Sequence, residues 1–116
     1  MKETSYEELI NSIRNNHFVV YGAGSHADKF LQILKHLGFE DNYLYSAVTR
    51  KDKDDKAELR LIHEVDRNKL IMIAAHDKNA KQMEQTLKEL GFRNYYLIYP
   101  HLIELVCGLP YKKMWI

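Results

Sequence analysis

The chain has 116 residues, 46% of them hydrophobic, which suits one compact domain with a core and leaves little room for a second. Its 17 basic and 16 acidic side chains almost cancel, which argues against the broad positive surface of a nucleic-acid-binding protein. The single cysteine, Cys107, cannot form an internal disulfide, and neither a signal-peptide pattern nor an apolar stretch of roughly 20 residues is present. We therefore expect a cytoplasmic protein with no nucleic-acid partner and no membrane insertion.

The N-terminal part of the chain predicts a helix, a strand and a second helix. Residues 4–16 carry two overlapping capping boxes, which begin at Thr4 and Ser5, and then apolar residues at helical spacing. The β-branched and aromatic run at 17–21 predicts a strand buried on both faces. After two glycines, residues 25–37 show helical spacing, and the next glycine is placed to end the helix in a left-handed conformation.

The rest of the chain continues the alternation of strands and helices. A charged loop without core residues at 49–58 separates two of the predicted strands. The apolar runs predict strands at 42–48, 59–62, 70–75 and 95–99, the helical spacing predicts a long helix after residue 75 that stops at Gly91, and residues 101–107 predict a short closing helix.

An internal repeat supports this order of elements. Residues 18–39 align without a gap on residues 71–92, with identical alanines at 27 and 80 and the same Leu-Gly-Phe ending. Convergence and duplication both account for the repeat. Either origin predicts an α/β fold with a Rossmann-like, doubly wound parallel sheet of about four or five strands and helices on both faces. We expect one such domain over residues 1–109, followed by a tail or linker at 110–116.

A glycine-rich turn lies between the first predicted strand and the second helix. Gly22-x-Gly24-x-x-Ala27 matches the dinucleotide-binding fingerprint in the context that it requires, with alanine in the third position. A phosphate there would meet free backbone N–H groups at the positive end of a helix. Ser25 either caps this helix or donates its hydroxyl to the same phosphate. The alternative is a tight turn that binds nothing.

The end of the second strand differs from a classical NAD site. The acidic residue that holds the ribose hydroxyls is missing, because the sequence there is Val48-Thr49-Arg50. NAD(P) is therefore disfavoured as a cofactor. Arg50 either meets an extra phosphate, as in NADP sites, or is a solvated side chain in a loop of mixed charge.

The stretches VVYGAGSHADKFLQILKHLGF, YSAVT and LIMIAAHDKNAKQMEQTLKELGF resemble the Rossmann-like accessory domains of bacterial cell-surface polysaccharide biosynthesis proteins. Such domains precede sugar O-acyltransferases of the sialic-acid and bacillosamine type. The resemblance implies that the glycine turn, with Gly22, Gly24, Ser25 and His26, contacts a nucleotide sugar. Those enzymes do their chemistry in a following β-helix of hexapeptide repeats, which these 116 residues lack. The resemblance thus implies a binding or regulatory module, with no catalytic residue assigned.

Histidines add a further set of candidate residues. His26 lies in the glycine turn and His76 follows the strand at 70–75, so a parallel sheet would bring both to its carboxyl edge. His76 is a candidate to contact a sugar hydroxyl or act as a general base. Asp77 either orients His76 or, as we favour, caps the next helix. We do not predict a metal site at His26, His63 and His76. Cys107 is expected to be a small core residue.

Three functions remain open after the sequence is considered. The first is a nucleotide or nucleotide-sugar binding module for bacterial surface-polysaccharide biosynthesis, and the second is a structural or oligomerisation domain with a vestigial glycine turn. In the second, the apolar tail at 110–116 forms the contact with a homodimer partner or a linked transferase domain. The third is an NAD(P)-dependent oxidoreductase. The predicted ligand-binding residues are Gly22, Ala23, Gly24, Ser25, His26, Thr49, Arg50, His76 and Asp77, and no metal ligand is predicted.

Overall fold

The structure is a computed structural model, which describes residues 5–50 and 59–107. Five parallel strands form one sheet in the order β3-β2-β1-β4-β5, so the predicted Rossmann-like parallel α/β fold is confirmed. The strands are β1 (Phe18–Tyr21), β2 (Tyr43–Val48), β3 (Arg60–Leu61), β4 (Leu70–Ile73) and β5 (Tyr95–Leu97). The helices are α1 (Tyr6–Asn15), α2 (Ser25–Leu37), α3 (Asp77–Leu90) and α4 (Leu102–Cys107), with single 3-10 turns at Glu40–Asn42, Ile62–Glu64 and Tyr99–His101.

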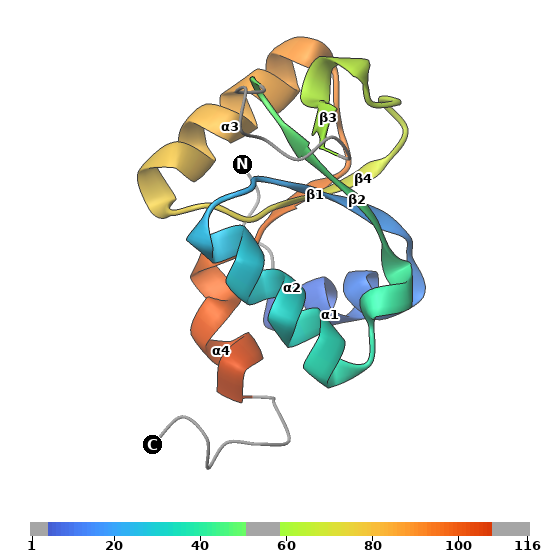
Figure 1. Cartoon of the computed structure of the whole chain (residues 1–116), viewed down its shortest axis with the longest axis vertical. Coiled ribbons are helices and arrows are strands. Elements are labelled where there is room, and N and C mark those ends of the chain that lie inside the picture. Colours follow the sequence, from blue (N-terminus) through green and yellow to red (C-terminus); the bar gives the residue numbers. More distant parts are fainter. Residues whose placement is uncertain (1–4, 51–58, 108–116) are drawn as a thin grey trace.

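Helices cover both faces of the sheet, with α3 on one face and α1, α2 and α4 on the other (Figure 1). All four residues of β1 are buried, and they alternate between the two layers. Phe18 and Val20 join the core on the side of α1, α2 and α4, whereas Val19 and Tyr21 join the core under α3. The chain runs outward from β1 to β2 and β3, then crosses to β4 and β5, so the topological switch point lies between β1 and β4.

The predicted cap of α1 at Ser5 and the predicted glycine ends of α2 and α3 are confirmed. The Ser5 side chain caps α1 by accepting the N–H of Glu8 at 3.2 Å, whereas Thr4 lies outside the described residues. Helices α2 and α3 end identically, at Gly38 and Gly91, both with positive φ. The phenylalanine after each glycine donates its N–H to a leucine carbonyl in the last turn at 2.9 Å. The shared Leu-Gly-Phe sequence therefore forms the same C-terminal motif twice.

Three sequence-based expectations are corrected here. The repeat is not gapless in the structure. Strand β1 and the N-cap Gly24 lie 52 residues before β4 and the N-cap His76, whereas the helix ends Gly38 and Gly91 are 53 residues apart, because α2 has 13 residues and α3 has 14. Each of the five strands is shorter than predicted. Cys107 is exposed at the end of α4 and is not a core residue. The tail at 110–116 lies outside the described part of the chain.

The turn after β1 leaves no room for a side chain at Gly22. This residue has φ of 136°, and a Cβ atom placed on it would lie 2.5 Å from the carbonyl oxygen of Ala74, just past β4. Its N–H donates to the carbonyl of Ala47 in β2 at 2.9 Å, and the N–H of Ala74 donates to the carbonyl of Tyr21 at 3.0 Å. Gly22 thus fixes the ends of three neighbouring strands against one another.

We expect Gly22→Ala to lower the free energy of unfolding by roughly 2–4 kcal/mol, because it adds both a clash with backbone and a strained φ. Gly24→Ala is the matched control, since nothing lies within 4 Å of a Cβ atom at that position. We expect the control to lose less than about 1 kcal/mol. Urea unfolding of the two variants measures both values, and equal losses would contradict the role given to Gly22.

Candidate functional site

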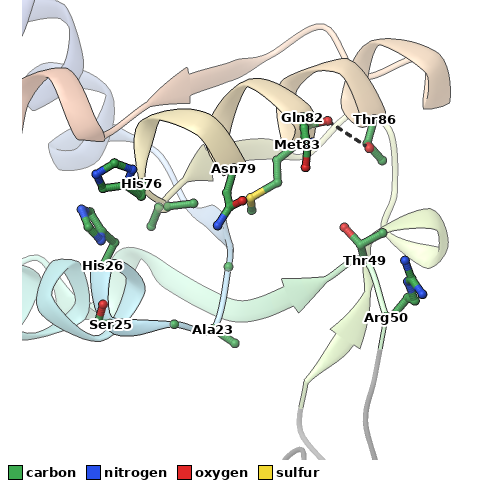
Figure 2. Close-up of a pocket in the computed structure, with 14 residues that line it drawn as sticks. Ala23, Ser25, His26, Thr49, Arg50, His76, Asn79, Gln82, Met83 and Thr86 are labelled. Atoms are coloured by element: carbon green, nitrogen blue, oxygen red, sulfur yellow. Dashed lines mark hydrogen bonds between the residues drawn. The ribbon is translucent and has the colours of Figure 1, made fainter.

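A cavity of about 480 Å³ lies at the carboxyl ends of β1, β2 and β4 (Figure 2). Three segments of backbone and one helix surround it. The turn 22–26 forms one wall, Thr49 and Arg50 contribute from the end of β2, residues 74–76 follow β4, and α3 covers the remaining side. The site is therefore at the topological switch point, where open α/β sheets bind their ligands.

A second cavity, of about 670 Å³, lies at the opposite edge of the sheet. Its lining includes Glu8 from α1 and Lys69 and Arg93 from the loops that precede β4 and β5. Its greater volume is no reason to prefer it, since ligands of open α/β sheets bind outside the carboxyl ends of the strands. The cavity at the carboxyl edge is therefore the candidate site.

Two helices begin at the edge of this site without a side-chain cap. Gly24 is the N-cap of α2 and His76 is the N-cap of α3, and neither makes a side-chain capping hydrogen bond. The first N–H groups of a helix have no intrahelical partner and carry partial positive charge. Because both caps line the cavity, the part of the cavity beside them offers backbone donors suited to an anion. Gly24 leaves open space where a side chain would stand.

Eight of the nine predicted ligand-binding residues line this cavity. His26 and His76 face each other across the switch point, with ring centroids 5.4 Å apart and ring planes nearly perpendicular at 87°. Thr49 hydrogen-bonds the hydroxyl of Tyr21, and Arg50 is exposed beside it. Figure 2 shows the two imidazoles at one end of the site and Thr49 with Arg50 at the other.

Asp77 is the predicted residue that does not line the cavity. Its carboxylate lies 3.7 Å from Lys81 and accepts a hydrogen bond from the hydroxyl of Tyr99, which raises the pKa of that tyrosine. The expected capping role of Asp77 is wrong, because His76 is the cap and Asp77 is the first residue of α3. Ser25 likewise is not a cap, since it is the first residue of α2.

The charge of the site is small and positive. None of the cavity-lining residues is acidic, and Arg50 is the single arginine or lysine among them. His63 lies elsewhere, 4.0 Å from Glu64, so the structure does not bring it to His26 and His76. Over residues 5–50 and 59–107, no group of three or more His, Cys, Asp and Glu side chains is placed to hold a metal ion.

One wall of the cavity was missed by the sequence analysis. Asn79, Gln82, Met83 and Thr86 line it from α3, and Figure 2 shows Asn79 and Met83 pointing toward the turn that carries Ala23. These positions follow the i, i+3, i+4, i+7 spacing of one helix face. That spacing in polar residues was the available signal, but a solvated helix face has the same pattern.

No family model, curated protein or solved structure matches the chain. In the described ranges, no helix combines the length and the apolar character needed to cross a membrane.

The face of α3 turned toward β5 anchors the helix through a buried carboxylate. Tyr95 donates its hydroxyl to Glu84 at 3.0 Å, and burial followed by this bond raises the pKa of Tyr95 to about 12. The folded protein thus holds the phenolic proton more tightly than the unfolded chain, in which the pKa is about 10. The stability from this proton is fully present below pH 10 and is lost as pH rises toward 12.

We expect the stability of the wild-type protein to fall more steeply between pH 10 and pH 12 than that of Tyr95→Phe, which has no proton to lose at this position. Urea unfolding at several pH values measures the slope. Titration of phenolate absorbance should show one tyrosine near pKa 12 that disappears in the variant. If stability falls equally steeply with pH in the two proteins, the raised pKa of Tyr95 is contradicted.

Proposed function

We propose that this chain is a nucleotide or nucleotide-sugar binding module. The observation that carries the proposal is the pair of uncapped helix N-termini that meet at one cavity, at Gly24 and His76. A phosphate group needs several donors and positive potential, and both are available there without a lysine. The open space at Gly24 supports the proposal further, because a ligand oxygen can approach the backbone closely.

We propose further that the module serves bacterial surface-polysaccharide biosynthesis. This part rests on the sequence resemblance to accessory domains of sugar O-acyltransferases, in which the glycine turn contacts a nucleotide sugar. The residues that match that turn are Gly22, Gly24, Ser25 and His26, and all four line the cavity. The geometry is compatible with a ligand held by its phosphates, which every nucleotide sugar carries.

The other two functions have less support. A dinucleotide oxidoreductase needs an acidic group for the ribose hydroxyls, and the end of β2 offers Thr49, whose hydroxyl bonds Tyr21, and Arg50. An oligomerisation domain would use the tail at 110–116, which lies outside the described residues. The cavity therefore favours the binding module.

Gly24→Asp and Gly24→Asn form a matched pair that tests the anion site. Both side chains are good N-caps, so we expect both variants to keep or slightly raise the melting temperature. The aspartate places a negative charge on the donors of α2, whereas the asparagine is neutral. We expect Gly24→Asp to lose nucleotide binding by roughly 100-fold or more, and well beyond the loss in Gly24→Asn.

Thermal unfolding against UDP-, CDP- and GDP-sugars, NAD(H), NADP(H) and S-adenosylmethionine measures this loss. A ligand at about 100 times its dissociation constant should stabilise the wild type by roughly 2.7 kcal/mol, which shifts the melting temperature by several degrees. If no compound shifts the wild-type transition, or if Gly24→Asp responds as the wild type does, the proposal is wrong. A response to NAD(H) alone would favour the oxidoreductase.

A further inference from the structure

The α3 wall, defined as Asn79, Gln82, Met83 and Thr86, lines the cavity from one side of α3. Asn79 is the third residue of α3 and borders the backbone donors of the first turn, whereas Gln82, Met83 and Thr86 lie farther along the helix. Asn79 and Gln82 are exposed, and Met83 and Thr86 are partly buried. The wall is therefore accessible to a second, different part of a ligand.

The α3 wall is uncharged and rich in hydrogen-bonding groups. Each amide of Asn79 and Gln82 both donates and accepts, and the hydroxyl of Thr86 can do the same, although it donates to the carbonyl of Gln82 at 3.2 Å here. Among the cavity-lining residues, no phenylalanine, tyrosine or tryptophan offers a flat surface for stacking a base. This chemistry matches a hydroxyl-rich, uncharged group better than a flat aromatic ring or a second anion.

The volume of the site leaves space for such a group. A volume of about 480 Å³ lies within the range of small-molecule sites, which is roughly 300–1,000 Å³. A phosphate group has five heavy atoms and fills only part of this space. The remainder extends from the helix N-termini along α3 toward Thr49 and Arg50 (Figure 2).

We propose that the α3 wall recognises the hydroxyl-rich glycosyl part of a phosphorylated ligand, and that Asn79 and Gln82 are its specificity-determining residues. This inference rests on the proposed phosphate site at Gly24 and His76. It assigns the phosphate to the helix N-termini and the sugar hydroxyls to the amides of α3. Both amides lie on the cavity side of the helix, and no acidic side chain competes with them in the lining.

Two probes separate these roles: UDP, which carries the phosphates and the uridine but no glucosyl group, and UDP-glucose. The variants are Asn79→Leu and Gln82→Met, which keep the size of the side chain and remove its hydrogen bonds. Gln85→Met is the matched control on the same helix, because Gln85 does not line the cavity and its amide donates to Glu89 at 3.3 Å. Titration calorimetry gives the dissociation constants, and melting temperatures confirm that each variant is folded.

We expect each cavity variant to weaken UDP-glucose binding roughly 5- to 10-fold, and to leave UDP binding within about twofold of the wild type. Gln85→Met should bind both probes normally. Wild-type affinity for UDP-glucose in both cavity variants, or an equal loss for both probes, would overturn the inference and leave the phosphate site standing. If neither probe binds the wild type, or if Gly24→Asp leaves both affinities unchanged, the proposed function fails and this inference fails with it.

Discussion

The close approach of the β1 turn to β4 is the constraint on which the site depends. The carbonyl of Ala74 occupies the position that a side chain on residue 22 would need, so only glycine allows the chain to turn there. The N–H of Gly22 is bonded to Ala47 in β2, which ties the same turn to the other neighbour of β1. The starts of α2 and α3 are therefore held on both sides of one opening, at the place where the direction of winding reverses.

The electrostatic character of the site follows from where the carboxylates of α3 are placed. Asp77 pairs with Lys81 and Tyr99, and Glu84 is buried with the hydroxyl of Tyr95, so both acids are turned away from the cavity. A carboxylate at either N-cap would occupy the free N–H groups, whereas Asp28 and Asp77 lie in the first turns of α2 and α3 but do not line the cavity. With those acids occupied elsewhere, the cavity keeps backbone donors, two imidazoles and one guanidinium for an anionic ligand.

The sequence predicted the fold better than it predicted the site. Continuous apolar runs, helical spacing and the two Leu-Gly-Phe endings are strong local signals, and the parallel sheet followed from them. The predicted cap of α3 was wrong by one residue: Asp77 satisfies the composition rule for an N-cap, but it is the first residue of α3, and its carboxylate lies near Lys81 one turn along the helix and near Tyr99. Cys107 was predicted to be buried but is exposed, because its apolar neighbours in sequence do not reveal which face of a short helix is covered.

Helix α3 provides one wall of the cavity, two buried core residues and two carboxylates on the side of β5. These groups lie on different sides of the helix because successive residues are turned by about 100° around its axis. On this spacing the α3 wall occupies one arc, Ala80 and Leu87 occupy the next and are fully buried, and Asp77 and Glu84 follow on the side of the β5 tyrosines. The core arc thus lies between the cavity and the carboxylates. Asn79 and Gln82 are exposed, so a substitution at either position can change ligand preference without disturbing the buried alanine and leucine or the Tyr95 bond, whereas Met83 also packs against that core.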